Sequence, residues 1–140
     1  HHLLRRAQRA GDLMCAARAG DLCVLLVEDS PRIADRLREL LQDQGVCVLA
    51  TVDNEQAAVR ALKEQQVDLL ILDLQLKVGT GFGVLEALGG QRPPTIVMTN
   101  YALPQYEERA RHYGVEHFLN KARDFERLPG IVADMRAGRA

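Results

Sequence analysis

Apolar residues along this chain fall into short continuous runs separated by stretches in which they recur at helical spacing. The run 67–74, which reads VDLLILDL, is apolar on both faces and has Asp73 near its end. A strand of this kind is typical of a parallel sheet covered by helices on both sides. The run 22–27 has the same character and leads into Glu28 and Asp29. Ligands of such sheets bind beyond the carboxyl ends of the strands, so two predicted strands bring three carboxylates to one edge.

Strands and helices are predicted to alternate along the whole chain. Strands are expected at 22–27, 46–50, 67–74, 94–99 and 115–119. Helices are expected from Pro31 to before Gly45, from Asn54 through Leu62, around 84–88, from Pro104 towards His112, and over 125–135. This alternation predicts an α/β fold with right-handed crossovers. The common solution at this size is a flavodoxin-like, doubly wound, five-stranded parallel sheet of order 2-1-3-4-5 with helices on both faces. Its switch point lies between the first and third strands.

Composition and charge narrow the class of protein. The 140 residues fit one domain, and 47% hydrophobic with 26% charged residues is an ordinary globular composition. The net charge of -1 gives no electrostatic reason to expect nucleic acid or membrane binding, and no apolar run approaches the roughly 20 residues that span a bilayer. Cys15, Cys23 and Cys47 are expected to be reduced residues of a cytosolic protein, so a cytoplasmic location is predicted.

The first twenty residues differ from the rest. His1-His2 resembles a tag remnant, and Met14 is a candidate native start. Leu3, Ala7, Ala10 and Met14 recur at helical spacing with arginines between them, which is compatible with a basic amphipathic anchor; a frayed helix is the favoured interpretation. We expect residues 1–20 to be a tag remnant or a flexible or helical extension, and residues 21–140 to form the domain.

The acidic cluster predicts a bound metal ion and a site for phosphate chemistry. Three neighbouring carboxylates repel one another, which raises their pKa values or recruits a cation. Mg²⁺ prefers oxygen ligands and leaves several coordination positions to water and phosphate oxygens. Two other predicted strand ends carry Thr99 and Lys121, a hydroxyl and an ammonium suited to phosphate oxygens. A phosphate-handling site at this edge is therefore predicted.

Taken together, four motifs resemble those of a known family. They are Glu28-Asp29, Asp73, Thr99 and the segment 118–121 (FLNK), each at the end of a predicted strand. From about Leu22 onward the chain resembles the receiver domain of two-component response regulators, the family that includes the bacterial chemotaxis regulator. That family is a signalling class whose members catalyse their own phosphotransfer and dephosphorylation without being conventional enzymes.

The resemblance implies a role for each motif. Asp73 would be the phosphoacceptor, a carboxylate nucleophile that takes a phosphoryl group from a histidine kinase or phosphotransfer protein. The implied magnesium ligands are Asp29 and Asp73 directly, Glu28 through water, and the backbone carbonyl of Gln75. Lys121 and Thr99 would contact the phosphoryl oxygens, and Thr99 and Phe118 would form the switch. Lys121 is further expected to add little to stability, since a strand-end ammonium buries little surface.

The chain departs from the family pattern after Lys121, and the sequence leaves several alternatives open. Ala122 stands where the family usually has a proline, so a trans bond is expected after Lys121. Competing functions are an aspartyl-phosphate phosphatase and a receiver-like binding scaffold that is never phosphorylated. Output is expected through the face built by the predicted helix 104–112, strand 115–119 and helix 125–135, which would bind a downstream protein or a second copy. Both a stand-alone receiver and an excised domain fit the sequence.

Overall fold

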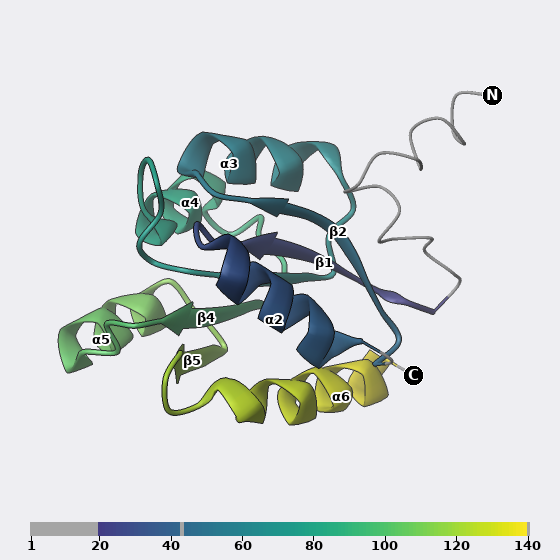
Figure 1. Cartoon of the computed structure of the whole chain (residues 1–140). Coiled ribbons are helices and arrows are strands. Elements are labelled where there is room, and N and C mark those ends of the chain that lie inside the picture. The colour runs from purple at the N-terminus through teal and green to yellow at the C-terminus, as the bar shows by residue number, and fades with distance from the viewer. Residues whose placement is uncertain (1–19, 43, 140) are drawn as a thin grey trace.

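A computed structural model of the chain describes residues 20–42 and 44–139, which form a five-stranded parallel sheet flanked by helices (Figure 1). The strands are β1 (Leu22–Val27), β2 (Val46–Val52), β3 (Leu69–Leu72), β4 (Thr95–Thr99) and β5 (His117–Asn120). The helices are α2 (Pro31–Leu41), α3 (Glu55–Glu64), α4 (Gly81–Leu88), α5 (Pro104–His112), the 3-10 turn η2 (Phe125–Arg127) and α6 (Leu128–Arg139). The strand order β2-β1-β3-β4-β5 confirms the predicted fold class.

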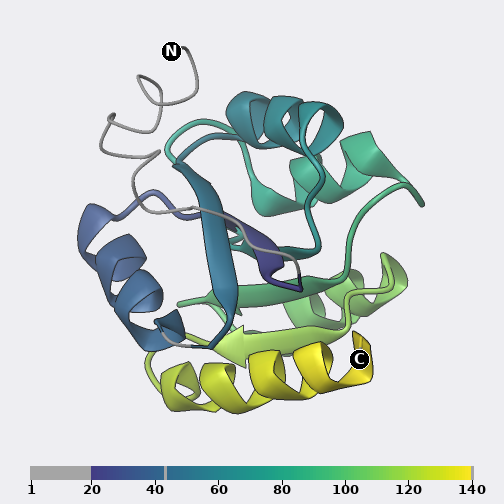
Figure 2. The same ribbon diagram turned by 90° about the vertical axis from the view of Figure 1, so that its right-hand side faces the viewer.

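Two apolar layers lie on either side of the sheet. Helices α2 and α6 cover one face, and α3, α4 and α5 cover the other (Figure 2). In β3, Leu69 and Ile71 pack into the first layer while Leu70 and Leu72 pack into the second. Successive strand residues point to opposite faces, which is why a central strand must be apolar throughout. The buried β3 thereby fixes Asp73 at the sheet edge.

Capping side chains begin the helices next to the acidic edge. The hydroxyl of Ser30 accepts a hydrogen bond from the amide of Ile33 at 3.3 Å, and Pro31 takes the first position of α2. Asn54 caps α3 through the amide of Ala57 at 2.9 Å. These caps satisfy amides that the first helical turn leaves without partners. The caps thus fix where α2 and α3 begin, next to the strand ends that carry the carboxylates.

Four of the five described strands differ from the prediction in their bounds. Strand β2 continues to Val52, while β3 covers only Leu69–Leu72 of the apolar run 67–74. The start of β3 is displaced because the carboxylate of Asp68 accepts the amide of Cys23 at 2.8 Å. Strand β5 begins at His117, since the carboxylate of Glu116 accepts the amide of Thr95 at 2.8 Å. Acidic side chains here replace backbone partners, and a hydrophobic pattern does not record that.

One cysteine prediction is wrong. Cys47 on β2 takes part in a disulfide, so the cysteines are not all reduced. Cys15 and residues 1–19 of the predicted extension lie outside the described residues. Within the described part of the chain, no helix is long and apolar enough to cross a membrane.

Candidate functional site

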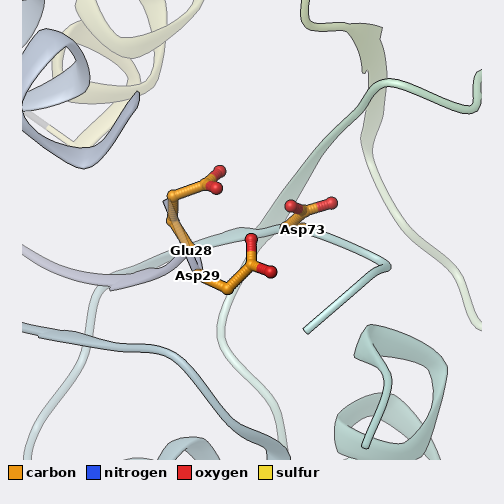
Figure 3. A group of neighbouring side chains, drawn as sticks. All are labelled: Glu28, Asp29 and Asp73. Atoms are coloured by element: carbon orange, nitrogen blue, oxygen red, sulfur yellow. The ribbon is translucent and has the colours of Figure 1, made fainter. Parts of the chain in front are cut away.

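Three carboxylates meet at the carboxyl ends of β1 and β3. Glu28 and Asp29 follow β1, Asp73 follows β3, and each offers an oxygen within 4.8 Å of the others (Figure 3). Glu28 and Asp73 are buried, whereas Asp29 is exposed. The parallel register of Val27 with Leu72 brings the two strand ends level. The structure thus assembles the predicted acidic cluster at the switch point of the sheet.

Lys121 joins two of these carboxylates. Its Nζ lies 2.7 Å from Oε1 of Glu28 and 2.6 Å from Oδ2 of Asp73. Lys121 is only 8% exposed, so the expectation that it buries little surface is wrong. Residue type and spacing alone do not reveal that burial.

Burial and charge shift the titration of this triad in defined directions. Burial raises the pKa of the Asp73 carboxyl; hydrogen bonding and attraction to Lys121 oppose the rise without cancelling it. The pKa of the Glu28 carboxyl is raised for the same reason. Burial works to lower the pKa of Lys121, but its hydrogen bonds to Asp73 and Glu28 outweigh burial and raise it. Lys121 is therefore protonated at neutral pH, and charging the two carboxylates costs free energy.

The charge balance and donor set fit Mg²⁺. Three carboxylates face one ammonium, so the ionised cluster keeps an excess of negative charge that a divalent cation offsets. All the donors are oxygens, as Mg²⁺ requires. A cavity of about 390 Å³ adjoins Glu28 and Asp29 and extends between α2, the end of β2 and the start of α3. This cavity gives an ion and its waters a route to the cluster.

A local network fixes Lys121 although no proline follows it. The side-chain oxygen of Asn120 accepts the amides of Ala122 and Arg123 at 2.8 and 2.9 Å. The carboxylate of Asp124 accepts the amide of Asn120 at 3.0 Å, and that bond lowers the pKa of Asp124. No described peptide bond is cis, which confirms the expected trans bond after Lys121. This network was not predicted from the sequence; Asn and Asp flanking a turn are the signal that could have indicated it.

Of the remaining predicted residues, Gln75 lies in the loop after β3, Thr99 ends β4, and Phe118 is on β5. The amide of Gln75 donates to Oδ1 of Asp73 at 3.2 Å. Thr99 is fully buried; its hydroxyl accepts the amide of Tyr101 at 3.0 Å, and its carbonyl accepts the amide of Lys121 at 2.9 Å. Phe118 is half-buried and packs against the apolar layer beneath α3, α4 and α5. Thr99 is thus directly bonded to both the Lys121 backbone and the chain that leads into α5.

The site and the sheet agree with one known family. The family model described as the response regulator receiver domain matches residues 24–133. The chain belongs to this family. It is therefore a signalling domain of the two-component type, and its fold is that of receivers.

Individual relatives place this receiver domain among proteins of different lengths. It is 32% identical over 122 residues to the two-component response regulator ORR1 of Oryza sativa subsp. japonica, covering 75% of this chain and 52% of the rice protein. It is 29% identical over 135 residues to the sensor histidine kinase GacS of Pseudomonas protegens, covering 91% of this chain and 14% of the kinase. The receiver spans about half the length of the first curated relatives it matches.

A solved structure adds a metal to the comparison. The receiver domain of sensor histidine kinase PA1611 from Pseudomonas aeruginosa is 26% identical, with a TM-score of 0.72 over 84% of this chain and 98% of that one. Its structure has a magnesium ion coordinated in the active site cleft.

Proposed function

We propose that this receiver domain is switched by phosphorylation of Asp73. The observation that supports this most is the ammonium of Lys121, which holds the Asp73 and Glu28 carboxylates inside a buried acidic cluster. An oxygen of the Asp73 carboxylate attacks the phosphorus of a phosphohistidine and forms an acyl phosphate. The P–N bond breaks, and its electron pair goes to the imidazole of the kinase or phosphotransfer protein. Water later hydrolyses the acyl phosphate and restores the carboxylate.

The surrounding residues stabilise charge during the transfer. Lys121 pairs with the phosphoryl oxygens, and the Thr99 hydroxyl donates to one of them after leaving the amide of Tyr101. Fixed donors and cations of this kind supply most of the catalysis in phosphoryl transfer. Glu28, Asp29, Asp73 and the backbone carbonyl of Gln75 would hold Mg²⁺, which supplies further positive charge when bound. The magnesium ion in the related receiver of PA1611 supports this assignment.

Two alternatives are less well supported. An aspartyl-phosphate phosphatase typically carries a second aspartate two residues after the nucleophile, and Gln75 stands there. A scaffold that is never phosphorylated has no need for a carboxylate pair buried against one lysine. Burying such charged groups costs free energy, and they are concentrated at functional sites.

Phosphorylation is tested by incubating the chain with a small phosphodonor and Mg²⁺ and measuring its intact mass. One phosphoryl group is expected on the wild type and none on Asp73→Asn. Exposed Asp134→Asn is the matched control and is expected to label normally. Labelling that persists in Asp73→Asn, or that proceeds equally in chelator, contradicts the proposal. Rapid turnover of a phosphomonoester favours the phosphatase instead.

Output is proposed to pass through the face formed by α5, β5 and α6, to a downstream protein or a second copy. Tyr101 and Leu103, at the start of this face, are 51% and 43% exposed. Charged residues of both signs follow them on α5, including the pair Arg111–Glu107 at 2.8 Å. A mixed-charge rim around apolar side chains suits protein partners, and direct nucleic acid or membrane contact is not part of the proposal.

The output face is tested by amide hydrogen exchange with and without a beryllofluoride phosphoryl mimic. Exchange is expected to change between Asn100 and Arg127, because Thr99 and Phe118 link the site to this face, and to stay nearly constant in α2. Changes concentrated in α2 argue against the face.

The proposed domain spans residues 21–140 and acts in the cytoplasm. This location rests on the signalling role and not on the cysteines, since Cys47 is not reduced.

A further inference from the structure

We propose that Glu55 is a positioning residue for the loop 74–80, which joins the phosphoacceptor Asp73 to α4. Glu55 is the first residue of α3 and lies outside the acidic cluster. The inference deepens the proposed function, because this loop carries the Gln75 carbonyl assigned to Mg²⁺.

Main-chain bonds first place the loop alongside the start of α3. The amide of Glu55 donates to the carbonyl of Val78 at 3.0 Å, and the amide of Lys77 donates to the carbonyl of Asp53 at 3.0 Å. Asn54 and Val78 form a parallel bridge. The loop thus pairs with the chain that enters α3 through an isolated bridge, which no apolar pattern predicts.

The Glu55 side chain then closes the far end of the loop. Its Oε1 accepts the amide of Thr80 at 3.1 Å. Thr80 pairs with Gln75 in an antiparallel bridge, and the amide of Gln75 donates to Oδ1 of Asp73 at 3.2 Å. Three links therefore connect the Glu55 carboxylate to the phosphoacceptor carboxylate.

Two glycines make room for this carboxylate. A Cβ at Gly79 would lie 2.5 Å from Cβ of Glu55, and a Cβ at Gly83 would lie 2.1 Å from its Oε1. Gly83 is inside α4, where glycine is unfavourable by about 1 kcal/mol relative to alanine. The space it leaves is filled by Glu55, which accounts for a glycine in a helix of only eight residues.

A matched set of variants separates positioning from a charge effect at the helix N-terminus, where any acidic side chain is favourable. Glu55→Gln keeps the length and an accepting oxygen but loses the charge. Glu55→Asp keeps the charge but is one methylene too short to reach the Thr80 amide. Glu55→Ala loses both, and the exposed Glu64→Ala on the same helix is the control. If Glu55 positions the loop, Glu55→Gln should behave like the wild type and Glu55→Asp should behave like Glu55→Ala.

Two readouts follow each variant by nuclear magnetic resonance. In chelator, amide exchange at Thr80 and Gln75 is expected to rise about tenfold in Glu55→Asp and Glu55→Ala, the scale of one lost hydrogen bond. In a Mg²⁺ titration followed at the Gln75 amide, the same two variants are expected to bind about fivefold more weakly. Glu55→Gln and Glu64→Ala are expected to match the wild type in both.

A Gly83→Ala variant gives a second, independent arm. Its Cβ displaces the Glu55 carboxylate, so Thr80 exchange is expected to rise in the wild-type background and to stay unchanged in Glu55→Ala. If Glu55→Asp behaves like the wild type while Glu55→Gln shows faster exchange and weaker Mg²⁺ binding, the charge at the helix N-terminus explains the data and the positioning role is wrong. Unchanged amide exchange in all variants also contradicts the positioning role. If the wild type does not bind Mg²⁺ in the titration, the proposed function is contradicted instead. The comparison of amide exchange in chelator still decides the role of Glu55.

Discussion

Replacing Lys121 by alanine removes the ammonium that balances the two buried carboxylates. In the wild type its Nζ lies 2.7 Å from Glu28 and 2.6 Å from Asp73, and all three residues are at most 8% exposed. Without Lys121, two acidic side chains whose pKa values are already raised by burial face each other uncompensated. We therefore predict that Lys121→Ala destabilises the metal-free domain.

The magnitude follows from the burial of the pair. Removing one partner of a buried ion pair costs about 3–5 kcal/mol. The low end applies here, since Asp29 is exposed and the adjoining cavity admits water to the cluster. A loss of about 3 kcal/mol lowers the melting temperature of a domain of this size by about 10 °C. Protonation of Glu28 or Asp73 relieves the repulsion, so the loss is expected to shrink as the pH falls below neutral.

Thermal unfolding in chelator, and again with Mg²⁺, measures the effect. Lys121→Met keeps most of the apolar stem and is expected to lose nearly as much stability as Lys121→Ala, because charge and not packing is missing. The exposed Lys63→Ala is the control and is expected to unfold like the wild type. Mg²⁺ is expected to stabilise Lys121→Ala more than the wild type, since the lysine no longer competes for the carboxylates. A melting temperature within 2 °C of the wild type in chelator, roughly 0.5 kcal/mol, refutes this reasoning.

Two further predictions concern Asp73 and its backbone. Because burial raises the pKa of Asp73 above its ordinary value of 3.8, the folded chain holds that proton more tightly than the unfolded chain, and the wild type loses stability as the pH rises above 3.8. In chelator, Asp73→Asn is therefore expected to be more stable than the wild type by a margin that grows with pH and vanishes near pH 3. Denaturant titrations that show a constant margin contradict this. Gly81→Ala places a Cβ 2.4 Å from the Asp73 carbonyl oxygen and 2.9 Å from Cα of Leu74, so it is expected to lower both the melting temperature and the extent of phosphorylation, whereas Gly90→Ala, with open space around it, is expected to change neither.

The fold could be predicted from the sequence because its strongest signals are local. An apolar run such as 67–74 has no stable exposed arrangement, and capping residues such as Ser30 and Asn54 mark where helices begin. Strand order then follows from the rules for parallel sheets. The strand ends were less predictable, since Asp68 and Glu116 bond to amides of other strands.

The candidate site could also be predicted from the sequence only in part. Grouping Glu28, Asp29, Asp73 and Lys121 needed only the rule that parallel strands end at one edge. The burial of Lys121, the network around Asn120 and Asp124, and the disulfide of Cys47 were not predicted. The burial of Lys121 depends on the path of its side chain in the folded protein, which neither residue type nor periodicity records. The network around Asn120 and Asp124 is local, and its residue types could have indicated it.

The central claim is that one carboxylate of the acidic cluster, Asp73, carries the phosphoryl group. Reduction of the phosphorylated chain with borohydride converts an aspartyl phosphate to homoserine, and peptide mass spectrometry then locates the modified position. The account predicts homoserine at position 73, formed in Mg²⁺ and absent in chelator, with Asp29 unmodified. Modification at Asp29 or Asp53, or none after exposure to both a small phosphodonor and a histidine-phosphorylated protein, would contradict it.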